Sequence, residues 1–196
     1  MKKKQLEMLL QGIENFSRPL PKLEQYFTPA LVAAEVLHIA YMRGELGIVC
    51  DLGCGTGILA IGAALLGARV VGVEIDSRAL AVAKKNAFKL GVEVDFIRGD
   101  AASIQLRGIE TVIMNPPFGA QKSSAGDRPF LDKATKIAKV IYSLHNAGSE
   151  EFIKEFVKPC QVDFVHRISF PLKKCFQFHS KDLRIMPVDL YRIVCG

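Results

Sequence analysis

The stretch Ile48-Val-Cys-Asp-Leu-Gly-Cys-Gly-Thr-Gly57 decides the fold of this 196-residue chain. Its apolar start predicts a short buried strand at 48–50, and the apolar run 58–66 behind it predicts a helix. Between them, glycines occupy every second position from 53 to 57. At a turn from strand to helix, glycine lets the backbone approach a ligand and adopt angles that other residues take only at a cost. The stretch therefore predicts an α/β fold with a ligand at this turn.

The spacing of the glycines narrows the class of ligand. The third glycine of the dinucleotide fingerprint G-x-G-x-x-G is absent, because Ile58 occupies that position. The phosphate-loop pattern GxxxxGK[ST] is absent as well. Both NAD and a nucleoside triphosphate are therefore disfavoured.

Two further carboxylates follow predicted strands. Glu74 ends the strand predicted at 70–74, 21 positions after Gly53, where a carboxylate can accept hydrogen bonds from both hydroxyls of a ribose. Asp100 follows the strand predicted at 94–97, where it can accept from an adenine amino group while the Ala101 amide donates to the ring. The carboxyl ends of neighbouring strands meet at one crevice of an open α/β sheet. The cofactor residues predicted in this part of the chain are Asp51, Gly53, Cys54, Gly55, Gly57, Glu74, Ile75, Asp100 and Ala101.

The tetrapeptide Asn115-Pro116-Pro117-Phe118 directly follows the strand predicted at 111–114 and carries the predicted catalytic residues. The nitrogen of an adenine N6 amine or of an amide is a poor nucleophile because its lone pair is delocalised. The Asn115 side-chain oxygen and the Pro116 carbonyl can hold the NH2 hydrogens so that the lone pair faces a methyl sulfonium. The prolines stiffen the loop, and Phe118 offers a flat face on which a base can stack. The tetrapeptide predicts methyl transfer from S-adenosylmethionine to an amine, with Asn115 also near the cofactor.

The rest of the chain continues the alternation of strands and helices. A helix is predicted after Thr28-Pro29, with Thr28 as N-cap and Gly44 as its end, and another from Ser77 as cap to Leu90. The later predicted elements are a helix at 130–138, a strand at 140–144, a helix at 149–157 and strands at 162–170 and 188–194. We expect a single domain over 1–196, with a helical segment at 1–45 and a Rossmann-like core at 46–196. Its mostly parallel seven-stranded sheet would end in an antiparallel pair, as in class I S-adenosylmethionine-dependent methyltransferases.

Composition places the chain among soluble proteins, and we expect it in the cytoplasm. No apolar run reaches the ~18 residues that span a bilayer, so no membrane association is expected. The five cysteines are scattered and form no C-x-x-C pair, which argues against a disulfide framework and against a metal site. We expect most of them to be small buried apolar residues.

The positive charge lies in the C-terminal part. Residues 119–196 carry 13 Lys/Arg and 8 Asp/Glu, whereas residues 1–118 carry 13 and 12. A phosphate-bearing substrate such as RNA would explain this excess, and so would a solvated surface rich in lysine. The loop predicted at 119–129 is a candidate substrate lid, and a second basic cluster follows position 172. The candidate RNA contacts are Lys122, Arg128, Lys173, Lys174, His179, Lys181 and Arg184.

Three segments resemble the methyltransferase-like-five family of ribosomal RNA adenine N6-methyltransferases. They are Asp-Leu-Gly-Cys-Gly at 51–55, Asn-Pro-Pro-Phe-Gly at 115–119 and Ser-Leu-His-Asn at 143–146. The family also has a segment similar to Glu-Gln-Tyr-Phe-Thr-Pro at 24–29, which implies that Gln25 and Thr28 contact the cofactor. The resemblance implies small-subunit ribosomal RNA as substrate and, in eukaryotes, a small zinc-binding activator protein as partner. The chain departs from the family at Glu74, where relatives often have Asp, and at Thr56, where they often have Cys.

Three alternatives remain open. DNA adenine methylation uses the same chemistry, but such enzymes commonly carry a separate recognition domain that 196 residues barely accommodate. Methylation of a release-factor glutamine at N5 shares the N-P-P motif, but that family usually has tyrosine where this chain has Phe118. A non-catalytic scaffold that kept the fold tends to lose the glycine turn or the N-P-P motif, and this chain has both.

Overall fold

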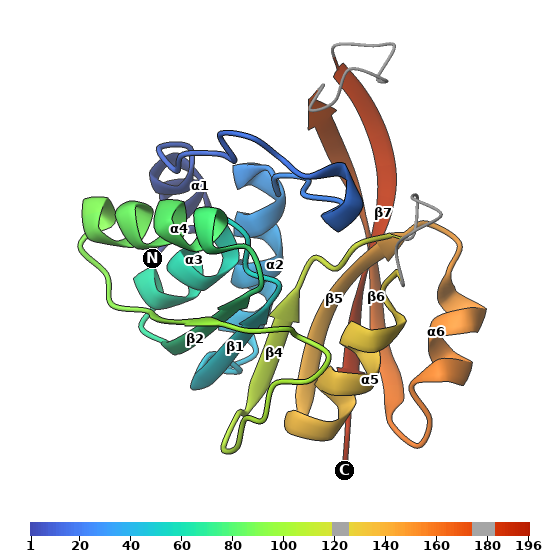
Figure 1. The fold of residues 1–196 in the computed structure, drawn as a ribbon. Helices are drawn as coiled ribbons and strands as arrows, with labels where there is room; N and C mark the ends of the chain where they lie inside the picture. Colours follow the sequence, from blue (N-terminus) through green and yellow to red (C-terminus); the bar gives the residue numbers. More distant parts are fainter. Residues whose placement is uncertain (119–125, 174–182) are drawn as a thin grey trace.

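Short apolar strands that alternate with helices assemble into one sheet in this computed structural model, which describes residues 1–118, 126–173 and 183–196 (Figure 1). The described strands form a seven-stranded sheet in the order β3-β2-β1-β4-β5-β7-β6. The first five in that order run parallel, whereas β7 is antiparallel to both β5 and β6. The strands are β1 Ile48–Leu52, β2 Arg69–Glu74, β3 Asp95–Arg98, β4 Thr111–Met114, β5 Val140–Asn146, β6 Gln161–Lys173 and β7 Leu183–Val194. The predicted fold class is confirmed.

Helices cover both faces of the sheet, so the central parallel strands β1 and β4 are buried on both sides. One core cluster joins α1, α2 and α3 to side chains such as Val49 and Ile113. The other joins α5 and α6 to the opposite side chains of the same strands, such as Cys50 and Val112. The helices are α1 Lys3–Leu10, α2 Ala30–Met42, α3 Ile58–Leu65, α4 Ser77–Leu90, α5 Arg128–Ile137 and α6 Glu150–Phe156, with a 3-10 turn η1 at Pro21–Leu23.

The sheet reverses its order at β1, which positions the site. β2 and β3 lie on one side of β1, and β4 and β5 lie on the other. After β1 the chain turns to α3 on one face of the sheet, and after β4 it turns to α5 on the other face. A crevice therefore opens between the carboxyl ends of these two strands. Gly53, Glu74 and Asn115 each come directly at or after a strand end that faces this crevice.

Two predicted helix caps are wrong by one residue. α2 begins at Ala30 with Pro29 at the N-cap, so Thr28 lies outside the helix. α4 begins at Ser77, and its cap is Asp76, whose Oδ1 accepts a hydrogen bond from the Arg78 amide at 3.0 Å. Aspartate and serine are both good N-caps, and their order along the chain does not tell which one adopts the extended backbone.

The expectation of unpaired cysteines is wrong for two of the five. Cys160 and Cys195 form a disulfide across 35 positions of sequence. Antiparallel pairing of β6 with β7 sets Gln161 opposite Val194, so the residues just outside this pair also face each other, with Cα atoms 4.4 Å apart. Cys50 and Cys54 are buried free thiols, as expected, and Cys175 lies outside the described residues.

The β6–β7 hairpin is longer than the strands predicted at 162–170 and 188–194. Its far end reaches well past the rest of the sheet in Figure 1. Pro187 interrupts the alternation in the sequence, yet it lies inside β7 opposite Ser169. Among the helices that the structure describes, none has the length and apolar character needed to cross a membrane.

Candidate active site

A cavity of about 370 Å³ opens at the crevice between β1 and β4. Most of the residues predicted for the site line it together, although they come from segments that are far apart in sequence. The predicted residues that line it are Gln25, Thr28, Asp51, Gly53, Cys54, Gly55, Glu74, Ile75, Asp100, Ala101, Asn115 and Pro117. Gly57, Pro116 and Phe118 do not line the cavity.

The glycine turn between β1 and α3 requires glycine for two reasons. Gly53 and Gly55 have φ angles of +75° and +55°, in the left-handed region that side chains disfavour. A Cβ on Gly53 would also lie 2.8 Å from Cε1 of Phe130, and one on Gly55 would lie 2.8 Å from Cζ of Phe16. The rings of Phe16 and Phe130 therefore pack against this turn, and neither Gly53 nor Gly55 has room for a side chain.

Asp51 places a buried carboxylate under this turn. Its Oδ2 accepts a hydrogen bond from the Ala60 amide at 2.9 Å, near the start of α3. Its Oδ1 is buried and has no hydrogen-bond partner among the described residues. Burial raises the pKa of this carboxyl to about 7, with a smaller contribution from the nearby Glu74 charge. An acceptor left open at the cavity wall suits a cationic or N–H donor group of a ligand.

Glu74 holds the turn and keeps acceptor capacity for a ligand. Its Oε2 accepts from the Gly55 amide at 2.9 Å and its Oε1 from the Asp76 amide at 2.8 Å. Burial raises the pKa of this carboxyl, and the backbone donors oppose the shift. Each carboxylate oxygen has a second lone pair, so a ribose diol remains compatible with both bonds.

Gln25 lies in the cavity wall, but its amide bonds to protein groups. Its Oε1 accepts from the Leu20 amide at 2.8 Å, and its Nε2 donates to Asp76 Oδ2 at 3.0 Å. These bonds close the segment before α2 onto the start of α4. A contact between Gln25 and a cofactor stays a prediction.

The far end of the cavity combines an exposed carboxylate with apolar surface. Asp100 accepts from the Ala102 amide through Oδ1 at 2.9 Å, and Ala101 beside it is buried. Ile75 is an exposed apolar side chain at the same wall. This pairing of an acceptor with apolar faces suits a purine ring. Burial raises the pKa of the Cys54 thiol well above its usual range, so this cysteine is a neutral wall residue and not a nucleophile.

Asn115 is oriented by a residue 87 positions away. Its Nδ2 donates to Thr28 Oγ1 at 2.9 Å, so the side-chain oxygen has a fixed direction. That oxygen, Oδ1, is buried and has no hydrogen-bond partner among the described residues. Since Asn115 lines the cavity, the site presents one oriented acceptor for an N–H group. Thr28, predicted as a cap or a cofactor contact, has the additional role of fixing this amide.

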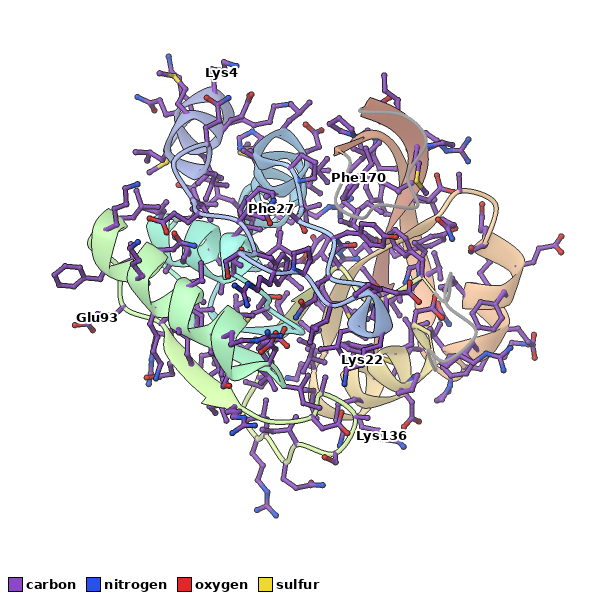
Figure 2. The ribbon with its side chains drawn as sticks, turned by 45° about the horizontal axis from the view of Figure 1, so that its top comes forward. Lys4, Lys22, Phe27, Glu93, Lys136 and Phe170 are labelled. Atoms are coloured by element: carbon purple, nitrogen blue, oxygen red, sulfur yellow. A yellow bond between two sulfur atoms is a disulfide. The ribbon has the colours of Figure 1, made fainter. Side chains whose placement is uncertain are left out.

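The other three residues of the tetrapeptide differ in whether they line the cavity. Pro117 lines the cavity, and Pro116 is buried and does not line it. Phe118 is half-buried and packs against the core cluster that contains α2 and Phe170. Phe27 packs against the same cluster, and Figure 2 shows Phe27 on the segment before α2 and Phe170 on β6. The stacking role of Phe118 stays a prediction.

Several cavity residues were not predicted, because their contacts join segments that are far apart in sequence. Phe16 and Phe130 are the two aromatic walls of the glycine turn. Asn86 on α4 joins the segment before Phe16 to the glycine turn, since its Nδ2 donates to the carbonyls of Glu14 and Thr56, both at 3.0 Å, and its Oδ1 accepts from the Glu14 amide at 2.9 Å. The other lining residues that were not predicted include Lys22, Leu23, Tyr26 and Phe27. Lys22 stands on the η1 turn in Figure 2.

Only some of the basic residues predicted to contact RNA belong to the described part of the chain. Lys122, Lys174, His179 and Lys181 lie outside the described residues. Lys173 ends β6, where its backbone is paired with Leu183, and Arg184 pairs with Leu172. Arg128 is exposed at the start of α5, and its guanidinium lies over the Phe152 ring, 5.1 Å from the centroid. Of the loop predicted at 119–129, Gly126 and Pro129 line the cavity.

Comparison with known proteins yields relatives along the whole chain. Residues 32–139 match the methyltransferase small domain family. The rRNA N6-adenosine methyltransferase of Drosophila melanogaster is 33% identical and covers 100% of this chain and 98% of its own length. The one from Danio rerio is 34% identical over 98% of each chain. A Pyrococcus horikoshii protein crystallised as a candidate RNA methyltransferase is 38% identical, covers 100% of this chain and 98% of its own, and superposes with a TM-score of 0.91.

Proposed function

Because this chain belongs to the methyltransferase small domain family, and within it to the methyltransferase-like-five proteins, we propose that it methylates the N6 amine of an adenine in RNA. S-adenosylmethionine is the methyl donor of this class of enzyme, and the residues of the cavity fit it. A bare glycine turn, an open buried acceptor on Asp51 and a diol acceptor on Glu74 suit its amino acid and ribose parts. Small-subunit ribosomal RNA is the proposed substrate, which implies a cytoplasmic site of action.

One observation carries the proposed chemistry: the buried, oriented and open Oδ1 of Asn115 at the cavity wall. When bound, the cofactor supplies an activated methyl group on a sulfonium, so the protein needs no strong base. Asn115 Oδ1 accepts one N6 hydrogen and turns the nitrogen lone pair toward the reacting carbon. The carbonyl of Pro116 is the proposed second acceptor. The proton on nitrogen becomes acidic as the new bond forms and can leave to water.

The proposed substrate is tested by offering the protein three classes of target. The full chain is incubated with labelled S-adenosylmethionine and separately with small-subunit ribosomal RNA, duplex DNA and a translation release factor, and products are digested and identified by mass spectrometry. We expect N6-methyladenosine in the RNA alone. Label found as N6-methyldeoxyadenosine or as N5-methylglutamine would instead assign the enzyme to DNA or to protein.

Asp51 provides a prediction on pH. With a pKa of about 7, its carboxyl is neutral and protonated below pH 7 and negative above it, so attraction for the cofactor's ammonium group grows as pH rises. We expect affinity for S-adenosylhomocysteine, measured by calorimetry, to increase about tenfold from pH 6 to pH 8. An aspartate with its ordinary pKa would give no change in this range. Asp51→Asn is the control, and it should remove the pH dependence that belongs to Asp51 and leave any that belongs to the ligand.

A small zinc-binding activator is the proposed protein partner. The β3 edge of the sheet is four residues long, with Ile97 36% exposed, and Phe88 on the adjoining α4 is 88% exposed. Exposed apolar residues at a sheet edge favour a covering protein. In this proposal the zinc belongs to the partner, because the described residues hold no group of three suitable ligands.

A further inference from the structure

A chain of buried polar side chains lies behind the catalytic loop and has no role in the chemistry proposed above. Ser143 Oγ lies 2.7 Å from His145 Nε2, and His145 Nδ1 lies 2.7 Å from Asp127 Oδ2. Ser143 and His145 are fully buried on β5, and both belong to the Ser-Leu-His-Asn segment at 143–146. Buried polar groups are retained where each is satisfied, and both nitrogens of this imidazole have a partner.

The proton positions follow from the acceptor at one end. A carboxylate can only accept, so Nδ1 of His145 carries the proton and donates to Asp127. In that tautomer Nε2 is an acceptor, and the Ser143 hydroxyl donates to it. The order is Ser143 to His145 to Asp127, with every bond directed toward the start of α5.

These are the side chains of a hydrolytic triad, but their placement excludes that activity. The Ser143 hydroxyl is fully buried, and neither Ser143 nor His145 lines the cavity. A nucleophile must reach the carbonyl of a substrate. The chain of bonds therefore acts on the structure around the cavity.

Both ends of this chain of bonds lie next to the active site. Ser143 is the register partner of Met114, the residue before Asn115. Asp127 is at the N-cap position of α5, yet its side chain makes no capping bond because it is hydrogen-bonded to His145. The first turn of α5 then supplies Pro129 and Phe130 to the cavity wall.

We propose that His145 is a positioning residue for methyl transfer. By binding Asp127 through Nδ1, it fixes the first turn of α5 and holds the Phe130 ring against Gly53 of the bare glycine turn. The consequence for the reaction rests on the proposed function. The effect on the first turn of α5 is independent of the proposed function, and this effect can be measured without substrate.

Replacing His145 by asparagine or by glutamine tests the contribution of each imidazole nitrogen on its own. The amide nitrogen of asparagine can replace Nδ1, whereas that of glutamine reaches the place of Nε2. We therefore expect His145→Asn to keep the bond to Asp127 and His145→Gln to lose it. Tyr142→Phe is the matched control, since it removes a partly buried hydrogen bond from β5 to Glu45, and Tyr142 does not line the cavity.

Hydrogen exchange of the Leu131 amide reports the first turn of α5, because this amide donates to the Asp127 carbonyl at 3.0 Å. In the protein without cofactor, we expect exchange about tenfold faster in His145→Gln and in Asp127→Ala than in His145→Asn or Tyr142→Phe. Turnover on RNA should fall about 100-fold in the first two variants. It should stay within about threefold of the parent in the last two.

Equal exchange and equal turnover in His145→Asn and His145→Gln would overturn the proposal, since His145 would then contribute stability alone. The Asp127→Ala variant keeps the test decisive if a His145 variant does not fold, because the Asp127 side chain is 20% exposed and its removal leaves β5 intact. If the parent enzyme methylates no RNA, the proposed function fails, while the exchange of Leu131 still decides the role of His145.

Discussion

Replacing Asn115 by alanine is expected to lower methyl transfer by a factor on the order of 100–1,000 and to leave cofactor affinity within about threefold. The substitution removes a buried acceptor at the cavity wall that has a fixed direction and an open lone pair. In the proposed function, cofactor affinity rests on the glycine turn, Asp51 and Glu74, and Asn115→Ala leaves these groups unchanged. Single-turnover rates on RNA and calorimetry with S-adenosylhomocysteine measure the two quantities separately.

The orientation of the Asn115 amide provides the control. Thr28→Val keeps the shape of the side chain but removes the acceptor for Asn115 Nδ2. The amide can then rotate, and we expect about a tenfold loss of turnover, smaller than in Asn115→Ala because the acceptor itself remains. Turnover retained in Asn115→Ala would contradict the role given to Asn115. Equal losses in both variants would instead make orientation the whole of its contribution.

The parts of the site that could be predicted from sequence are those fixed by strand ends. β4 at Thr111–Met114 has the predicted bounds, and β1 and β2 differ from them by one or two residues. Once apolar runs and glycines identify parallel strands, their carboxyl ends must meet, and this brought Gly53, Glu74 and Asn115 together in the prediction. Local pattern and global topology agree at these positions.

The parts that could not be predicted depend on contacts between distant segments. Thr28 binds Asn115 instead of capping α2, a choice that is invisible in the Thr-Pro pair itself. Cys160 meets Cys195 only because of the β6–β7 register. Phe16 and Phe130 reach the glycine turn from loops and helix ends whose paths no periodicity describes. Sequence therefore predicted the acceptors of the site but not the contacts that hold them in position.

The second large effect is expected from Gly53→Ala, which should lower cofactor affinity about 100-fold. The new methyl group would lie 2.8 Å from Cε1 of Phe130, closer than carbon atoms pack. Gly53 is anchored on the other side, since its amide donates to the Val73 carbonyl at 2.8 Å. The turn or the ring must therefore move, and either movement changes the wall of the proposed cofactor site. Calorimetry with S-adenosylhomocysteine measures the loss, and thermal unfolding measures the accompanying cost in stability.

Backbone strain and collision can be separated with Gly108, which has a φ of +74°, close to the +75° of Gly53. A Cβ added to Gly108 would point into open space, with no contact within 4 Å beyond its chain neighbours. Gly108→Ala should therefore cost the same backbone strain, on the order of 1–3 kcal/mol, and leave cofactor affinity unchanged. The double variant Gly53→Ala, Phe130→Ala removes the collision and keeps the strain. If affinity recovers in the double variant, the collision with the Phe130 ring is the cause of the loss in Gly53→Ala. If Gly108→Ala weakens binding as much as Gly53→Ala, strain transmitted through the fold is the cause, and the bare turn is not a requirement of the cofactor site.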